Sequence, residues 1–118
     1  MSRKIQKSRL LAFKRQNGRC YYCDFPMWLR NLDDFTSKYG ISVSQAKRLM
    51  CTAEHLIARQ DGGSDASKNI VAACWFCNSA RHKRTSALSS EAFKKLVFQR
   101  IKQLKWHQQQ FHHMLEII

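Results

Sequence analysis

The chain of 118 residues has few of the residues that build flexible linkers, and few acids. It contains one proline and four glycines, and neither a low-complexity segment nor an internal repeat marks a linker. No uncharged apolar run approaches the ~20 residues of a membrane-spanning helix. The charged first residues lack the apolar core of a secretory signal. We therefore expect one soluble domain over residues 1–118, cytoplasmic, not secreted and without a membrane partner.

The scarcity of acids leaves a strong positive charge. Lysine and arginine number 21 against 8 acidic residues, which gives a net charge of +13 and a pI near 10.0. Such a charge is typical of proteins that bind a polyanion, and nucleic acid is the first candidate. The basic side chains occur in small clusters, namely Arg3-Lys4, Lys14-Arg15, Lys47-Arg48, Arg81 with Lys83-Arg84, and Lys94-Lys95. We expect Arg81, Lys83 and Arg84 to be the best placed of these to contact a nucleic-acid backbone.

Four of the five cysteines form two pairs of the same short spacing. Cys20 and Cys23 make one C-x2-C pair, and Cys74 and Cys77 make the other. In a reducing compartment such pairs are better interpreted as metal ligands than as disulfides, and two pairs supply the four thiolates of a closed zinc site. We expect this Zn2+ to stabilise the fold without taking part in catalysis. Cys51 has no such partner, and we expect it to be a small buried apolar residue.

The rest of the sequence predicts an α+β fold. The expected helices cover residues 8–16, 28–39, 42–50 and 75–84, and the expected strands cover residues 51–57 and 70–73. Gly40 would end the second helix, and Ser42 with Gln45 forms a capping box for the third. Asp61-Gly62-Gly63 marks the turn of the loop between the strands.

The C-terminal part predicts one long amphipathic helix over about residues 89–116. Ser89 or Ser90 would cap it, and a stripe of helical period is formed by Phe93, Val97, Ile101, Leu104, Phe111, Leu115 and Ile118. We expect this helix to pack against the body of the domain, although it could also mediate a dimer. The three histidines His107, His112 and His113 lie in this segment, and we expect solvated or packing roles for them.

A set of polar residues lies between and just after the cysteine pairs. Glu54-His55 comes first, Asn69 follows, and Asn78 and His82 lie one helical turn apart after the second pair. Together with both cysteine pairs and Asp61-Gly62-Gly63, this order resembles the zinc-bound branch of the HNH endonucleases. The resemblance covers about residues 9–85 and implies a ββα-metal core, in a small standalone member of the phage, prophage or restriction type.

The resemblance also implies roles for individual residues. His55 would be the general base, and Asn69 would brace the loop that holds it. Glu54 and Asn78 would bind a catalytic divalent ion, with His82 as a further ligand. Independent chemistry agrees, because a neutral imidazole can take a proton from water near neutral pH. A hard divalent ion held by few protein ligands also keeps positions free for water and phosphate oxygens.

Two positions differ from the commoner family pattern. Glu54 stands where aspartate is more usual, so its longer side chain must retract or rotate to hold an ion in the same place. Asn78 occupies a position that is histidine in the members that name the family. An oxygen-rich site favours Mg2+ or Mn2+, whereas His82 as a ligand shifts the preference toward Ni2+, Co2+ or Zn2+.

The sequence thus predicts a metal-dependent HNH endonuclease that nicks or cuts DNA, double-stranded for preference, with low sequence specificity. A protein partner could supply specificity, and a monomer and a dimer are both compatible with the pattern. The alternative is a zinc-stabilised nucleic-acid-binding module that does not cut. A bacteriocin-like toxin nuclease, which would use the same chemistry, would need a translocation domain, and we do not expect one here.

Overall fold

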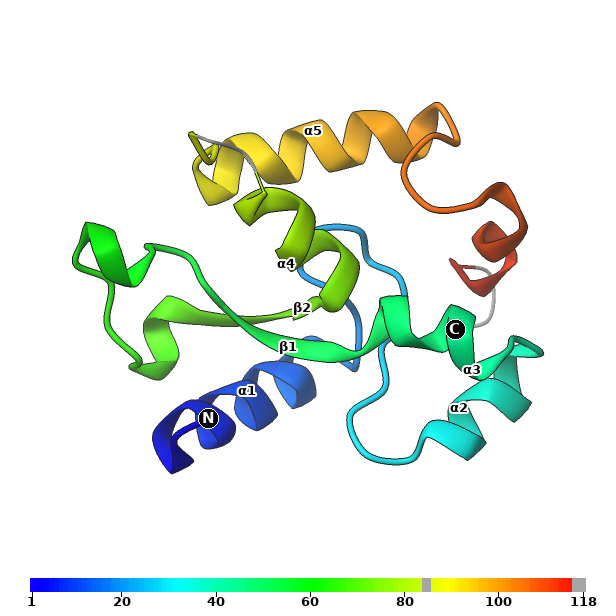
Figure 1. Ribbon diagram of the computed structural model, residues 1–118, viewed down its shortest axis with the longest axis horizontal. Coiled ribbons are helices and arrows are strands. Elements are labelled where there is room, and N and C mark those ends of the chain that lie inside the picture. Colours follow the sequence, from blue (N-terminus) through cyan, green and yellow to red (C-terminus); the bar gives the residue numbers. More distant parts are fainter. Residues whose placement is uncertain (84–85, 116–118) are drawn as a thin grey trace.

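A two-stranded antiparallel hairpin lies at the centre of the fold (Figure 1). The computed structural model describes residues 1–83 and 86–115. Strand β1 covers Cys51–His55 and β2 covers Ile70–Cys74, with Cys51 paired to Cys74 and His55 paired to Ile70. Helix α4, Trp75–His82, follows β2 directly. The expected α+β fold is confirmed, and β1, β2 and α4 form one ββα unit.

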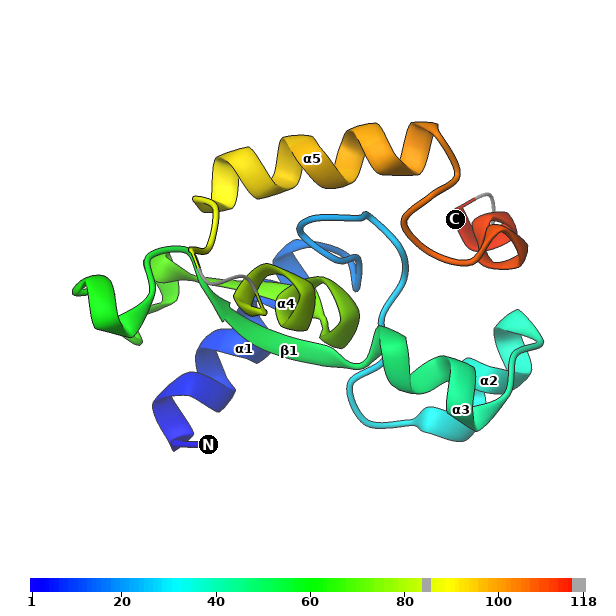
Figure 2. The ribbon, with the colours of Figure 1, turned by 45° about the horizontal axis from the view of Figure 1, so that its top comes forward.

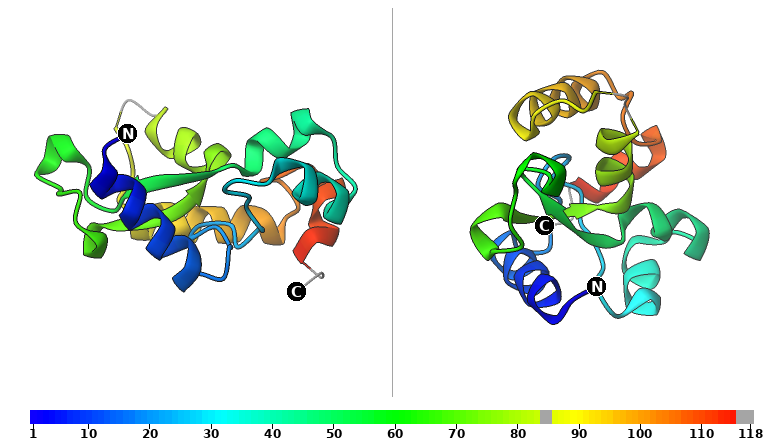
Figure 3. Two further views of the ribbon diagram at one scale, coloured as in Figure 1. Left: turned by 90° about the horizontal axis from the view of Figure 1, so that it is seen from below. Right: turned by 60° about the vertical axis from the view of Figure 1, so that its left-hand side comes forward.

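Helix α1, Arg3–Arg15, packs against both strands on the side of the hairpin away from α4 and α5 (Figures 1 and 3). It begins five residues earlier than expected, because the Ser2 side chain caps it by accepting a hydrogen bond from the Ile5 amide. At its other end the Gln16 side chain exchanges two hydrogen bonds with the backbone of Ala72, of 2.8 and 3.0 Å. The hairpin edge is thereby tied to α1.

The segment between the first cysteine pair and β1 folds into short helices at one end of the molecule (Figure 2). Helix α2 covers Leu32–Tyr39 and α3 covers Val43–Ala46, followed by a 3-10 turn over Lys47–Leu49. The predicted stop at Gly40 and the capping box of Ser42 and Gln45 are confirmed. The predicted start at Trp28 is wrong, because Asn31 caps α2 and Trp28 instead pairs with Met50 in an isolated β-bridge.

The expected long C-terminal helix is two shorter pieces. Helix α5, capped by Ser89, covers only Ser90–Lys102. The chain then turns, with Leu104 at a positive φ of 57°, and ends in a 3-10 helix over Gln109–Leu115. This return buries His107 and Phe111 in the core. A straight helix would have carried both side chains past the body, and Ile118, the last residue of the expected stripe, lies outside the described residues.

The core surrounds the cysteines. All five are buried, and the largest fully buried side chains around them include Phe25, Phe93, Phe111 and Leu49. Cys51 is buried as expected, and burial raises the pKa of its thiol to about 12. In the described part of the chain no helix is long and apolar enough to cross a membrane.

Candidate functional site

The two cysteine pairs meet in one buried cluster. The ligand atoms of Cys20, Cys23, Cys74 and Cys77 all lie within 4.8 Å of one another, and the sulfurs of Cys23 and Cys74 are 3.9 Å apart. Four thiolates bound at ~2.3 Å to one tetrahedral ion have sulfurs about 3.8 Å apart. The cluster therefore fits a closed zinc site, which joins the N-terminal knuckle to the junction of β2 and α4.

The protonation of these thiols also fits a site built around a cation. Burial raises the pKa values of Cys23 and Cys77, and the contacts with Cys20 and Cys74 raise both further. Burial opposes ionisation of Cys20 as well, but hydrogen bonds from the other three thiols outweigh it and lower its pKa. Ionisation of Cys23 and Cys77 would therefore be favoured by a positive ion between the sulfurs.

Donors from the returning C-terminal segment complete the surroundings of the cluster. Trp106 donates its indole N–H to the sulfur of Cys77 at 3.1 Å. His107 places Nε2 3.3 Å from the sulfur of Cys23 and packs against the Phe25 ring. Burial lowers the pKa of His107 to about 3, so it is a neutral packing residue. Such contacts reduce the cost of burying negative sulfur.

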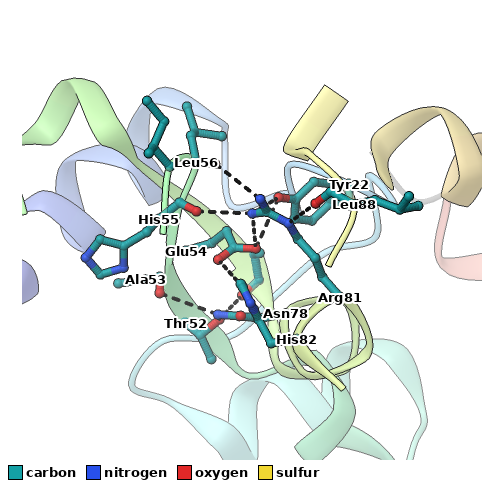
Figure 4. A network of polar contacts seen from close by, with 12 residues as sticks. Tyr22, Thr52, Ala53, Glu54, His55, Leu56, Asn78, Arg81, His82 and Leu88 are labelled. Carbon is teal, nitrogen blue, oxygen red and sulfur yellow. Dashed lines mark hydrogen bonds and ion pairs between the residues drawn. The ribbon is translucent and has the colours of Figure 1, made fainter. Parts of the chain in front are cut away.

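Beside the hairpin lies an open cleft of about 770 Å³ that contains most of the predicted catalytic residues. Its lining includes Glu54 and His55 from the end of β1 and Asn78 and His82 from α4. Asn78 and His82 lie on one face of α4, and Glu54, which is on β1 of the paired strands, points toward that face (Figure 4). The structure thus brings together four residues that the sequence spreads over 29 positions.

Two of these residues, Glu54 and His82, are in direct contact. Glu54 Oε1 and His82 Nε2 lie 3.0 Å apart, which is also about the separation of adjacent ligands 2.1 Å from an octahedral ion. Asn78 donates its amide nitrogen to Thr52 Oγ1 at 3.0 Å and to the carbonyl of Ala53 at 3.4 Å. Its amide oxygen is therefore the atom left for a cation.

His55 has a partner that the sequence did not suggest. Its Nε2 lies 2.8 Å from Oδ1 of Asp65, which also accepts hydrogen bonds from Arg59. The hydrogen bond from His55 lowers the pKa of Asp65, and the contacts from Arg59 also lower it, against a smaller opposing effect of desolvation. Asp65 is therefore a carboxylate that holds the imidazole from one side.

Asn69 ties together the loop that carries Asp65. Its Oδ1 accepts from the amide of Ile57 at 2.9 Å, while Nδ2 donates to the carbonyls of Ile57 and Ser64 at 3.0 and 2.8 Å. The three hydrogen bonds of this buried amide connect both arms of the loop. This geometry is what a bracing residue requires.

Arg81 is not where we expected a DNA contact. Its side chain is buried, and it donates to Glu54 Oε2 and to backbone carbonyls that include those of His55 and Leu88. Because these N–H groups donate to oxygens of the protein itself, the Arg81 side chain is poorly placed to bind a DNA phosphate. Lys83 is exposed at the end of α4, and Arg84 lies outside the described residues.

Two residues next to the predicted set were missed by sequence reasoning. Tyr22 donates its hydroxyl to Glu54 Oε2 at 3.1 Å, and burial, followed by the charge of Glu54, raises its pKa. Asp65 lies in the loop, ten residues after His55. The only available signals were an aromatic residue inside the C-x2-C knuckle and an acid beside a glycine turn. Neither pattern indicates which residue the tyrosine or the aspartate would contact.

Comparison with known proteins agrees with this geometry. A model of the family described as HNH endonuclease matches residues 20–84, which is more than half of the chain. No curated protein and no solved structure matches this chain. The matched residues include both cysteine pairs, the hairpin and α4. Because the family model covers more than half of the chain and the two cysteine pairs meet in one cluster, the chain belongs to the HNH endonuclease family.

Proposed function

We propose that this protein is a metal-dependent endonuclease that hydrolyses phosphodiester bonds in DNA, with His55 as the general base. The observation that carries the proposal is the convergence of Glu54, His55, Asn78 and His82 on one cleft. Family membership supports the reaction class, because HNH endonucleases are typically metal-dependent nucleases that hydrolyse phosphodiesters. The four-cysteine cluster would hold structural Zn2+, with no open position for substrate.

The catalytic divalent ion would be held by Glu54 Oε1, the amide oxygen of Asn78 and Nε2 of His82. When bound, the ion neutralises charge on the phosphate and on the leaving 3′ oxygen. Two oxygen ligands suit Mg2+ or Mn2+, and the imidazole also admits Ni2+. Glu54 and Asn78 are fixed by hydrogen bonds to other protein groups, whereas the His82 side chain is 39% exposed.

His55 would take the proton from the attacking water. If the Asp65 carboxylate accepts a hydrogen bond from Nε2–H, the neutral imidazole keeps its lone pair on Nδ1. Asp65 and Arg59 would then act as positioning residues, since they fix the ring without reaching the reacting atoms. Asn69 would keep this arrangement in place by holding the two arms of the loop together.

DNA would bind across the mouth of the cleft, in contact with exposed basic side chains. Met1 and Ile5, the latter on helix α1, form one wall of the cleft, and the exposed residues of α1 include Arg3, Lys4 and Lys7. Lys83 is exposed where α4 ends. Phosphate contacts of this kind give affinity without sequence specificity and weaken steeply with added salt.

A supercoiled-plasmid assay tests the proposal. Wild type and His55→Ala are loaded with zinc and then given EDTA, Mg2+, Mn2+ or Ni2+. We expect wild type to nick only with added metal. His55→Ala should be slower by about 10²- to 10⁴-fold, the usual contribution of a general base. The control His113→Ala removes an imidazole that lies on the C-terminal 3-10 helix, and it should cleave as wild type does.

DNA binding is measured in parallel by fluorescence anisotropy at several salt concentrations. His55→Ala should keep the affinity and salt dependence of wild type. If neither protein cleaves with any metal while both bind DNA, the protein is a non-catalytic nucleic-acid-binding module. Equal loss of cleavage and binding in His55→Ala would point to a folding defect instead.

A further inference from the structure

The two oxygens of the Glu54 carboxylate have different surroundings. The side chain is 2% exposed, and Oε2 accepts hydrogen bonds of 3.1 Å from both the Tyr22 hydroxyl and Nη1 of Arg81. Oε1 faces His82 across 3.0 Å (Figure 4). One oxygen is thus anchored in the interior, and the other is presented to the cleft.

This anchoring explains how glutamate can stand at a position where aspartate is more usual. The extra methylene of Glu54 would otherwise give the carboxylate more rotamers and a longer reach. Contacts to Oε2 restrict that freedom before any ion arrives, because Tyr22 and Arg81 are themselves buried. A ligand that is held in its binding position loses less entropy when the metal binds.

The position of the Tyr22 hydroxyl is set by the zinc knuckle. Tyr22 lies between Cys20 and Cys23 and is 4% exposed. Its amide N–H donates to the sulfur of Cys20 at 3.4 Å, and its ring packs edge-on against Phe93 of α5, with ring centroids 4.9 Å apart. The tyrosine therefore has one end at the thiolate cluster and the other at the candidate catalytic carboxylate.

Arg81 connects this hydroxyl to the strand that carries the proposed base. Its Nη1 donates to the Tyr22 oxygen at 3.2 Å and to the carbonyl of His55 at 3.1 Å. Its Nη2 donates to the carbonyl of Leu56 at 3.2 Å. The guanidinium thus ties the zinc knuckle, the Glu54 carboxylate and the end of β1 into one buried unit.

We propose that Tyr22 is a positioning residue for the catalytic ion, so that the structural zinc site sets the geometry of the catalytic metal site through Glu54. This inference rests on the proposed role of Glu54 as a ligand. Its consequence is that the zinc knuckle does more than stabilise the fold. Removing one hydroxyl from the knuckle should weaken metal binding at the cleft while leaving zinc in place.

The test compares Tyr22→Phe with Tyr21→Phe. Each variant removes one phenolic oxygen from the same knuckle, but the Tyr21 ring lies under Lys94 Nζ, 3.9 Å from its centroid, in a groove lined by α5. All proteins are loaded with zinc, and zinc content and melting temperature are measured first. Mn2+ affinity is then measured by electron paramagnetic resonance, with Glu54→Gln as the reference for loss of the site. Plasmid nicking is followed separately.

We expect Tyr22→Phe to keep its zinc and melt near the wild-type temperature, but to bind Mn2+ about tenfold more weakly, the low end for loss of a supporting hydrogen bond. Tyr21→Phe should match wild type. Equal Mn2+ affinity in wild type and Tyr22→Phe would overturn the inference, as would the same weakening in Tyr21→Phe. Mn2+ binding that depends on Glu54 and Tyr22 without any nicking would retain the inference and reject the nuclease. Absence of wild-type Mn2+ binding would reject both.

Discussion

Arg81 and Lys83 are two residues apart on or just after α4, but their environments are opposite. The Arg81 side chain is 5% exposed and ion-pairs with Glu54 at 3.1 Å, whereas Lys83 is exposed. Removing one partner of a buried ion pair leaves the other charge without compensation. Removal of an exposed lysine leaves no buried charge without a partner. Arg81 should therefore contribute to the free energy of unfolding, and Lys83 should not.

Arg81→Met should therefore lower the free energy of unfolding by about 3–5 kcal/mol. Lys83→Met should change it by no more than about 0.5 kcal/mol, but should weaken DNA binding and reduce the salt slope by about 1. Urea unfolding of the zinc-loaded proteins measures the first effect, and DNA titration at several salt concentrations measures the second. A stable Arg81→Met protein with selectively weakened DNA binding would restore the original sequence interpretation.

At the level of residues, the sequence predicted which side chains meet but not how each is supported. Glu54, His55, Asn78 and His82 follow a spacing that places them on the hairpin and one helix face, and the structure brings them together. Contacts of Tyr22 and Asp65 depend on how loops and the knuckle close in three dimensions. Arg81 was misassigned because an arginine on a basic helix is usually solvated, and only the buried carboxylate beside it reverses that expectation.

The loop between β1 and β2 is the element on which the proposed base depends. Gly63 accounts for its close approach to the end of β1, because a Cβ at this position would overlap the carbonyl oxygen of Ile57. Asn69 also bonds to that carbonyl. The predicted Asp61-Gly62-Gly63 turn therefore does more than reverse the chain, since it lets the loop close tightly enough for Asp65 to reach His55.

Gly63→Ala should open this loop and reduce plasmid cleavage by about 10- to 10²-fold, because a small misplacement of a catalytic group costs up to about 10²-fold. Zinc content should stay at the wild-type value. Hydrogen exchange of residues 56–69 should become faster, because the three hydrogen bonds of Asn69 no longer form together.

The matched control is Gly40→Ala. Gly40 has a positive φ of 64° and no neighbouring atom near its added Cβ, so the change should cost about 1–2 kcal/mol of strain. Cleavage should survive in that control, and loss in both variants would mean that stability alone sets activity.

Some helix ends were predicted from their capping residues, whereas the caps Ser2 and Asn31 were overlooked and the C-terminal end depends on tertiary contacts. Ser42, Ser89 and Gly40 carry their own local signals, and each acts at the expected place. The helical period of the C-terminal stripe continues past Lys102, but the contacts of Trp106 and His107 with the cysteine cluster favour a turn at Leu104. Periodicity reports which residues are apolar at helical spacing, and it does not report where the partner surface lies.

At the scale of the whole molecule, the cysteine cluster connects parts of the chain that otherwise have few reasons to meet. It joins the knuckle at residues 20–23, the end of β2, the start of α4 and, through Trp106 and His107, the returning C-terminal segment. Because a chain of this length buries a limited core, a metal that crosslinks these parts would supply much of the folding free energy.

Zinc removal should consequently unfold the protein as well as abolish its activity. A strong chelator should abolish the cooperative thermal transition and reduce the helical circular dichroism signal, and Trp106 fluorescence should change with it, since its indole N–H lies on a cysteine sulfur. Acidification should act in the same direction. Burial raises the pKa values of Cys23 and Cys77, so their thiols hold protons strongly, and zinc affinity must fall as the pH is lowered because protons compete for the sulfurs.

Mild EDTA treatment that strips only the cleft metal provides the control for that experiment. It should stop plasmid nicking with zinc content and circular dichroism unchanged, because a site of two oxygens and one half-exposed imidazole holds its ion far less tightly than four thiolates do. Activity should then return on addition of Mg2+ or Mn2+, whereas the zinc-free chain needs zinc before either ion can act. A zinc-free protein that keeps its dichroism and melting temperature would show that packing around the buried thiols suffices, and the four cysteines would then have to be assigned another role.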